Sequence, residues 1–421
     1  MTDMRALLET ALGHHQGGRL AEAESIYRQV LAAEPENADC LHLMGMLADQ
    51  QGRTDEAIEL IGRAIAIEPE HAAARSNLGL VLQRAGRLAG AIAQYREAVR
   101  LRPDLAQLHA NLGLVLRDCG DLAGAAAAFA GAVSAMPGWA DAHLNLGTTL
   151  IRQGKPEEAA ARFSEAVRLR PDWAAAHNDL GLALNRLGRV GDAITAFERA
   201  LALDPAMAEA HNNLGRALQD QNKVGEAVAC FERALVLKPG MAEAHNHLGL
   251  ALKAQGRIVD AIASFERAAA LNPTMPEIRV NLGIALQQAG RGDEAITAFR
   301  RALALSPGMA EAHLGLGLTL QDQGAADAAR AEYAAAIAAD SGLAEARLAL
   351  CMAQIPAIYA EASEIARTRA AYEQALRALR DEVGTIVAKN DLARAIGTSQ
   401  PFFLGYQGRN DRALQALYGE L

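Results

Sequence analysis

A proline recurs every 34 residues along most of this chain. The series is Pro35, Pro69, Pro103, Pro137, Pro171, Pro205, Pro239, Pro273 and Pro307, and the next step falls on Ser341. A fixed period kept over this length is typical of a structural unit that is repeated and stacked on its neighbours. The period therefore predicts an elongated repeat array, in which each unit contacts mainly the units beside it.

Other positions of the unit keep the same register when Pro276 is counted as position one. Position eight is glycine from Gly45 to Gly317, and position twenty is alanine from Ala23 to Ala329. Position twenty-four is aromatic in nine of ten units, with Ile61 as the exception. A glycine inside a helix costs about 1 kcal/mol relative to alanine, so a repeated one needs compensation. We expect two helices to approach closely there, with the alanine of position twenty on the facing surface.

Position fifteen predicts the turn between the two helices of each unit. It holds Gly52, Gly86, Gly120, Gly154, Gly188, Gly256 and Gly290, with Asn222 in their place once. Glycine, and after it asparagine, suits the left-handed conformation in which a helix ends. The proline at the end of the unit stops the second helix.

This pattern resembles the tetratricopeptide repeat (TPR) over about residues 4–343. The resemblance implies an all-α fold, an α-α superhelix or solenoid of about ten helix-turn-helix repeats. Residues 4–37 form a degenerate first repeat, 38–309 the regular repeats and 310–343 the last repeat. Residues 344–383, which contain Pro356, are expected to form capping helices.

The end of the chain has a different character. Residues 384–421 are interpreted as a non-repeat connector, and Phe402, Phe403 and Tyr406 are concentrated there. The last apolar residues follow the spacing of one helical face. They are Leu414, Leu417, Tyr418 and Leu421. This face runs to the last residue without a stop signal, which predicts that the native protein is longer.

Composition limits the classes of partner. The formal net charge of −9 disfavours nucleic acid and anionic membranes, which both require a basic surface. The four cysteines show no CxxC spacing and are expected to be reduced thiols of a cytoplasmic protein. The charge-free run 122–140 contains Pro137 and keeps the repeat register, so we interpret it as repeat rather than as a membrane span.

Position six carries the main candidate site, a column of polar residues on successive first helices. The column consists of Asn77, Asn111, Asn145, Asp179, Asn213, His247 and Asn281. Asparagine is a mediocre helix former, and its carboxamide offers both a donor and an acceptor to a peptide backbone. We therefore expect an extended polypeptide to bind this ladder in the concave groove. The alternative is that these side chains bond within or between units.

Two other columns were weighed as sites. Position four is histidine at His109, His143, His177, His211, His245 and His313. Metal ligands must converge within a few ångströms, whereas these residues belong to different units, so they are interpreted as half-buried packing residues. The glutamates of position two, Glu209, Glu243, Glu277 and Glu311, make a preference for basic ligands a secondary possibility. No catalytic motif is present, and no metal or cofactor is predicted.

The units AHANLGLVL, AHLNLGTTL and AEAHNNLGRAL resemble the repeat half of protein O-linked N-acetylglucosamine transferases and SPINDLY-type proteins. The stretch 399–419 resembles the connector before the glycosyltransferase half in bacterial members. The resemblance implies that Asn77, Asn111, Asn145, Asn213 and Asn281 hold substrate proteins, while Asp179 and His247 depart from the ladder.

Two functions compete for this sequence. The first is an interaction scaffold for polypeptides, which could also self-associate. The second is the non-catalytic, substrate-recognition portion of a glycosyltransferase whose catalytic domain would follow residue 421.

Overall fold

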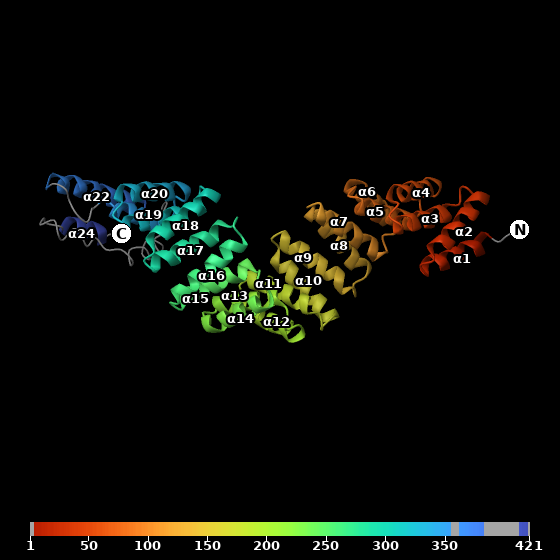
Figure 1. Ribbon diagram of the computed structural model, residues 1–421, viewed down its shortest axis with the longest axis horizontal. Helices are drawn as coiled ribbons and strands as arrows, with labels where there is room; N and C mark the ends of the chain where they lie inside the picture. Colours follow the sequence, from red (N-terminus) through yellow and green to blue (C-terminus); the bar gives the residue numbers. More distant parts are fainter. Residues whose placement is uncertain (1–3, 355–361, 383–411, 420–421) are drawn as a thin grey trace. The chain divides into compact units, whose positions relative to one another are not determined.

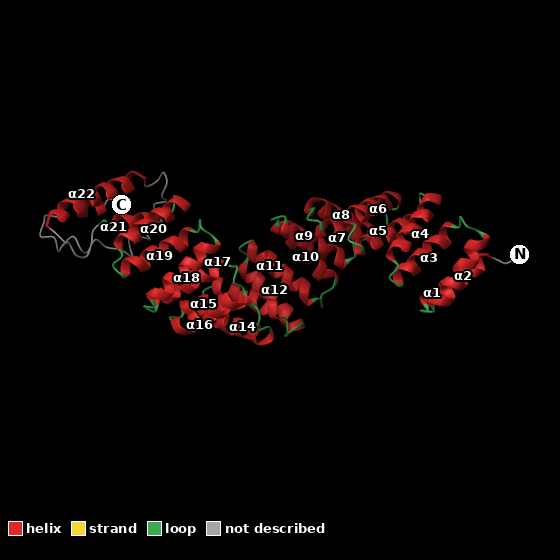
Figure 2. Ribbon diagram, turned by 45° about the horizontal axis from the view of Figure 1, so that its top comes forward, coloured by secondary structure: helices red, strands yellow, loops and turns green. Residues whose placement is uncertain are grey.

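The computed structural model describes residues 4–354, 362–382 and 412–419. This part of the chain contains 23 helices and no strand, and the predicted all-α repeat fold is confirmed (Figure 2). Pro356, Phe402, Phe403, Tyr406 and Leu421 lie outside the described residues.

The chain divides into two compact bodies, the N-terminal body of residues Met1–Ala206 and the C-terminal body of residues Met207–Leu421. The N-terminal body holds helices α1 to α12 (Figure 1). Their bounds are α1 Met4–Gln16, α2 Leu20–Ala33, α3 Ala38–Gln50, α4 Thr54–Ile67, α5 Ala72–Arg84, α6 Leu88–Leu101, α7 Ala106–Asp118, α8 Leu122–Ala135, α9 Ala140–Arg152, α10 Pro156–Leu169, α11 Ala174–Arg186 and α12 Val190–Leu203.

The C-terminal body holds the remaining helices. They are α13 Ala208–Asp220, α14 Val224–Leu237, α15 Ala242–Ala254, α16 Ile258–Leu271, α17 Pro276–Gln288, α18 Gly292–Leu305, α19 Ala310–Asp322, α20 Ala326–Ala339, α21 Ala344–Met352, α22 Ala362–Glu382 and α24 Arg412–Gly419. Up to α20, each odd-numbered helix is the first helix of a unit and packs against the even-numbered second helix that follows it.

A left-handed residue joins the two helices of each unit, as predicted. The position-fifteen glycines have positive φ angles, and Asn222 takes their place with φ 62°. Gly18 and Gly324 adopt the same conformation at the ends of the array. The backbone N–H of the next residue then bonds to a carbonyl of the first helix, as Lys223 does to Leu218 at 2.9 Å. Such bonds satisfy carbonyls that the end of a helix leaves free.

The position-eight glycines make room for an aromatic ring. A Cβ at Gly113 would lie 2.7 Å from the Phe129 ring of the second helix, and one at Gly215 would lie 2.6 Å from Phe231. Gly45 meets Ile61, which fills the same space where the aromatic residue is missing. The helices therefore approach closely, and the nearest group is the ring of position twenty-four. The alanine of position twenty lies on the facing surface, as expected: its carbonyl oxygen would be 3.2 Å from a Cβ at Gly45 (Ala57) and 3.3 Å from one at Gly317 (Ala329). Buried alanines, leucines and these rings form most of the core.

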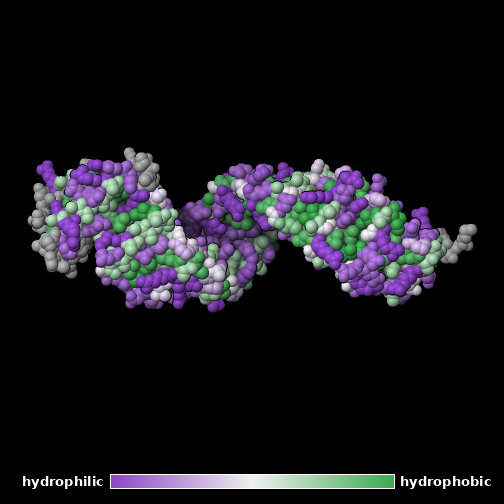
Figure 3. All heavy atoms as spheres, turned by 90° about the horizontal axis from the view of Figure 1, so that it is seen from above, coloured by the Kyte–Doolittle hydropathy of each residue, from purple (hydrophilic) through white to green (hydrophobic). Residues whose placement is uncertain are grey.

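On the surface, polar and apolar residues are interspersed over the face shown in Figure 3.

A second contact joins successive units through position four. The Nε2 atoms of His109, His143, His177, His245 and His313 lie 2.9–3.1 Å from the carbonyl oxygen of the proline six residues earlier. Arg75 and Arg279 donate to the corresponding proline carbonyls of the preceding units, Pro69 and Pro273, at 2.8 and 3.2 Å. A carbonyl only accepts, so Nε2 carries the proton. The histidine column thus ties each turn to the next first helix.

The repeat pattern continues beyond the last proline-bearing unit. Arg347 on α21 donates from Nε to the carbonyl of Ser341 at 2.7 Å, the same contact with serine in place of proline. Helix α21 therefore occupies the place of the first helix in a further unit of the array. Leu414 and Leu417 of α24, the described leucines of the apolar face predicted at the chain end, are buried in a cluster that also contains Leu348 of α21 and Tyr372 and Leu376 of α22.

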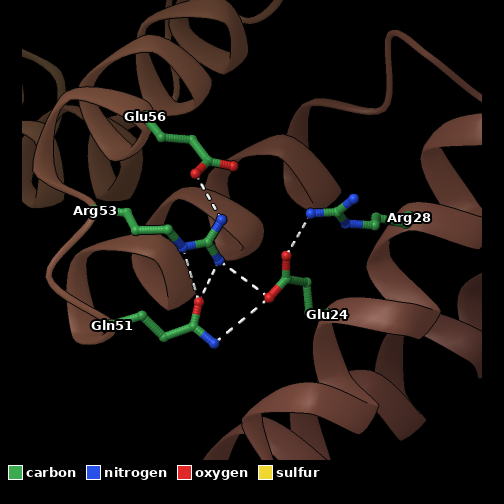
Figure 4. A network of polar contacts seen from close by, with 5 residues as sticks. All are labelled: Glu24, Arg28, Gln51, Arg53 and Glu56. Carbon is green, nitrogen blue, oxygen red and sulfur yellow. Dashed lines mark hydrogen bonds and ion pairs between the residues drawn. The ribbon is translucent and has the colours of Figure 1, made fainter.

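An ion-pair network joins the first unit to the second (Figure 4). Arg53, which precedes α4, pairs with Glu24 of α2 at 3.0 Å and with Glu56 at 2.6 Å. Glu24 also accepts from Arg28 at 2.6 Å, and this bond, with Arg53 nearby, holds the pKa of Glu24 below its usual value. A network of several charges stabilises more than an isolated surface pair.

We predict that Gly113→Ala destabilises the protein by about 1–3 kcal/mol, because the added methyl group overlaps the Phe129 ring. The matched control is Gly62→Ala inside α4, where a Cβ meets nothing within 4 Å. This control is expected to gain up to about 1 kcal/mol from helix propensity. Calorimetric melting measures both variants, and equal melting temperatures would contradict the packing account.

We predict that His177→Leu lowers stability by about 1 kcal/mol, because the Pro171 carbonyl loses its donor. His177→Arg should lose less, since arginine makes this contact at Arg75 and Arg279. Leucine itself fits the position, as Leu41 occupies it in the second unit. The melting temperatures of the two variants test this prediction. It would be refuted if His177→Arg melted no higher than His177→Leu.

Candidate functional site

One face of each first helix stays accessible. Positions two, six, nine and thirteen follow the i, i+4, i+7, i+11 spacing that places side chains on one side of a helix. On α7, Gln107 and Asp118 are exposed while Asn111 and Leu114 are half-buried. The opposite residues of α7, including Leu112 and Val115, are buried. We call this strip of four positions the first-helix face.

All seven predicted ladder residues lie on this face and are half-buried. They are Asn77 on α5, Asn111 on α7, Asn145 on α9, Asp179 on α11, Asn213 on α13, His247 on α15 and Asn281 on α17. At two units the neighbour of position six is the aromatic ring of the preceding unit. The rings of Phe231 and His247 lie 5.6 Å apart, and a Cβ at Gly315 would lie 2.5 Å from the Phe299 ring. In these units the ring covers part of position six.

Three ladder residues bond to position five of the preceding unit, 35 residues earlier. Asn77 Nδ2 donates to His42 Nε2 at 2.7 Å, and Asn281 Nδ2 donates to Asn246 Oδ1 at 3.0 Å. His247 Nδ1 lies 2.9 Å from Asn212 Oδ1 and donates to it. Burial lowers the pKa of both His42 and His247 to about 4, so neutral rings make these bonds. Here the alternative that the sequence left open, bonding between units, is observed.

Two other ladder carboxamides are held only through their oxygens. Asn111 Oδ1 accepts from Gln107 at 2.9 Å, and Asn145 Oδ1 accepts from Arg117 at 3.0 Å. Arg117 also lies over the Phe129 ring, 5.7 Å from its centroid. The Nδ2 groups of both asparagines donate to no other residue in the described part of the chain. These fixed carboxamides present two N–H donors each on the first-helix face of α7 and α9.

Asp179 puts a carboxyl group where its neighbours have carboxamides. Burial raises the pKa of Asp179 to about 6, although Asn178 Nδ2 donates to it at 3.3 Å and favours the charged form. A carboxyl group whose pKa rises on folding stabilises the protein in its protonated form. The stabilising free energy from the protonated Asp179 carboxyl is fully present below about pH 4, the pKa of the group in the unfolded chain. It is lost as the pH rises through about 6, the pKa of the group in the folded protein.

Sequence reasoning missed the partners at position five. His42, Asn212 and Asn246 are the residues that engage the next unit, whereas the corresponding Ala110 and Leu144 cannot. The signal was in the sequence: in these pairs a histidine or asparagine at position five precedes Asn or His at position six of the following unit, whereas the smaller Ser76 makes no such bond to Asn111. Ala110 and Leu144 instead leave Asn145 and Asp179 without that partner.

One cluster near the N-terminus has metal-ligating residue types. Single ligand atoms of Asp39, Glu68 and His71 lie within 4.8 Å of one another. However, the Ala74 backbone N–H donates to His71 Nδ1 at 3.3 Å, which puts the ring proton on Nε2 facing Asp39. A protonated Nε2 offers no lone pair to a metal, so His71 acts as a helix cap.

No helix in the described ranges combines the length and apolar character that a membrane span requires. The charge-free run forms α8 and the following turn, with Phe129 buried in the core. This placement agrees with its interpretation as repeat.

We predict that Asp179→Asn stabilises the protein at about pH 7.5 by about 1–3 kcal/mol, because the ionised carboxylate is half-buried. At about pH 4 the protonated carboxyl resembles the carboxamide, so the difference should nearly vanish. Melting temperatures of both proteins across this pH range test the prediction. A stabilisation that is independent of pH would contradict it.

Solved structures with similar folds match only parts of this chain. MamA is 29% identical and covers 38% of this chain and 95% of its own, with a TM-score of 0.36. YrrB, described as a TPR protein with an unusual peptide-binding site, is 25% identical over 43% of this chain and 94% of its own, with a TM-score of 0.39. PilF of Pseudomonas aeruginosa is 22% identical over 48% and 92%, with a TM-score of 0.44. Among curated proteins, none matches the chain.

The family model decides the assignment. The tetratricopeptide repeat model matches residues 42–106, 81–142, 144–208, 212–276 and 280–344, and a second model of that description matches residues 4–29. The matched segments span most of the chain. The chain belongs to the tetratricopeptide repeat family.

Proposed function

We propose that this protein is an interaction scaffold that binds extended polypeptide along its first-helix face. The supporting observation is the state of Asn111 and Asn145. Their oxygens are occupied by Gln107 and Arg117, while their Nδ2 groups have no described partner. The proposed ligand groups are therefore backbone carbonyls, which accept from these donors whatever side chains the polypeptide carries.

The surroundings of the two carboxamides suit such a ligand. Leu114 and Thr148, at position nine of the same helices, are half-buried and lie one further turn along the face. A hydrogen bond made beside partly apolar groups is stronger than one made in open water. Because Gln107 and Arg117 already hold the carboxamides, little rotamer freedom is left to lose when a polypeptide binds.

The double variant Asn111→Ala with Asn145→Ala tests this proposal. A phage-displayed library of random, unstructured peptides supplies binders, whose affinities are then measured by fluorescence anisotropy. Loss of two hydrogen bonds of about 1 kcal/mol each should weaken binding by about 10- to 30-fold. The melting temperature should change little, because the variant removes only the Oδ1 acceptors of the exposed Gln107 and the half-buried Arg117 side chains, whose donors can bond to water instead.

The matched control is Gln29→Ala with Gln94→Ala, which removes two carboxamides from the second helices α2 and α6. This control should bind the selected peptides as the unchanged protein does. Equal affinities for both double variants would refute the ladder as a binding site. Asn77→Ala with Asn281→Ala, in contrast, should lower the melting temperature, since both residues bond the preceding unit.

A second proposal rests on the resemblance of the repeats and of residues 399–419 to O-linked N-acetylglucosamine transferases. In that case the same face would recognise protein substrates for a glycosyltransferase domain. The full reading frame of the gene tests this proposal. A nucleotide-sugar domain encoded after Leu421 supports it, and a stop codon directly after Leu421 contradicts it.

We also propose a cytoplasmic location, with neither nucleic acid nor anionic membrane as the main partner. All four cysteines are free thiols, and burial raises the pKa of Cys40 and Cys351 to about 12. Thiols in this state are typical of a reducing compartment. Cell fractionation tests the location, and recovery in an extracellular or membrane fraction would contradict it.

A further inference from the structure

The first-helix face of the C-terminal body carries a row of glutamates. Position two is Glu209, Glu243, Glu277, Glu311 and Glu345 on successive first helices, and all five are exposed. Lys238 pairs with Glu209 at 2.8 Å. Glu243, Glu277 and Glu311 form no ion pair with any residue in the described part of the chain. The row therefore presents uncompensated negative charge to a ligand.

The N-terminal body differs in charge at the same positions. Over the four positions of the face, α13, α15, α17 and α19 hold six acidic residues and one basic residue. These are Glu209, Asp220, Glu243, Glu277, Glu311, Asp322 and Arg216. The corresponding positions of α5, α7, α9 and α11 hold three of each sign, namely Asp118, Asp141, Asp179, Arg84, Arg152 and Arg186. Only the C-terminal face is strongly acidic.

A row of apolar side chains runs beside the glutamates. Position nine is Leu250, Ile284 and Leu318 on α15, α17 and α19, and Leu318 is 37% exposed. Seven residues separate positions two and nine, which is about 10 Å along a helix. An acidic row and an apolar row therefore lie parallel to each other across three neighbouring first helices.

We propose that the C-terminal body binds a polypeptide in which basic and apolar side chains alternate. In an extended chain, successive side chains point to opposite sides. Such a chain, lying between the two rows, directs lysine or arginine toward Glu243, Glu277 and Glu311 and apolar residues toward Leu250, Ile284 and Leu318. This inference rests on the proposed function and adds the chemical class of the partner.

The geometry also sets the length of the partner. Packed helices lie about 8–10 Å apart, and an extended chain rises about 3.3 Å per residue, so about three residues span one unit. A peptide of about 12 residues therefore crosses the four helices from α13 to α19. An acidic peptide or a nucleic acid would meet repulsion from the glutamate row.

Three synthetic peptides of this length test the inference by fluorescence anisotropy, each used below the concentration at which it self-associates. In the first, Lys and Leu alternate; in the second, Glu and Leu; in the third, Lys and Ser. The Lys–Leu peptide should bind at least about 10-fold more tightly than either of the others. Only this peptide offers basic side chains to the glutamate row and apolar side chains to the apolar row. Its affinity should fall as ionic strength rises.

The decisive variant is Glu243→Lys with Glu277→Lys and Glu311→Lys. It should weaken binding of the Lys–Leu peptide by about 10-fold or more. The matched control, Glu226→Lys with Glu232→Lys and Glu266→Lys on the second helices α14 and α16, makes the same change in net charge and should weaken it by less than about 3-fold.

Equal effects of the two triple variants would overturn the inference, as would equal binding of the three peptides. If the random library yields binders that depend on Asn111 while the Lys–Leu peptide does not bind, this inference fails and the proposed function stands. If neither assay yields a binder, both fail.

Discussion

The contact between the position-eight glycine and the ring of position twenty-four sets the spacing of the helix pairs from α5 and α6 to α19 and α20. With no Cβ on the first helix, the ring of the second helix lies directly against the backbone, as Phe129 does at Gly113. The first helix then buries one side against its partner and leaves the other side accessible. The first-helix face, and any site on it, depends on this contact being repeated in register.

Two kinds of hydrogen bond transmit that register from one unit to the next. The position-four side chain holds the carbonyl at the end of the preceding second helix, and histidine, arginine and the Arg347–Ser341 pair all achieve this. Position six adds a bond to position five of the preceding first helix at Asn77, His247 and Asn281. The same column can therefore serve stability in one unit and, as proposed, ligand binding in another, depending on whether position five of the preceding unit holds a side chain that reaches it, as His42, Asn212 and Asn246 do.

The N-terminal and C-terminal bodies share the same repeated helix pair, but their first-helix faces differ in charge. Positions two, nine and thirteen of the first-helix face contribute little to stacking, so their side chains are free to vary while the buried ones repeat. In the N-terminal body the face is balanced in charge and carries Asn111 and Asn145. In the C-terminal body, glutamates at position two accompany apolar residues at position nine. The helix dipole also favours these glutamates in the first turn, so acidic charge there is stabilising for the fold.

The sequence by itself determined the repeat length, the two helices of each unit, the left-handed residue at positions such as Gly52 and Asn222, and the side of each first helix that faces solvent. These features follow from local backbone preferences and from the helical period, which a single unit already contains. The tertiary structure decided which groups meet: within a unit, the ring of Phe129 lies at Gly113, and across units, the Pro171 carbonyl meets His177 and the ladder residues meet their partners. The contacts across units depend on the offset between stacked units, which brings together residues such as Asn281 and Asn246, 35 positions apart. The offset results from how whole units pack, and no local pattern encodes it.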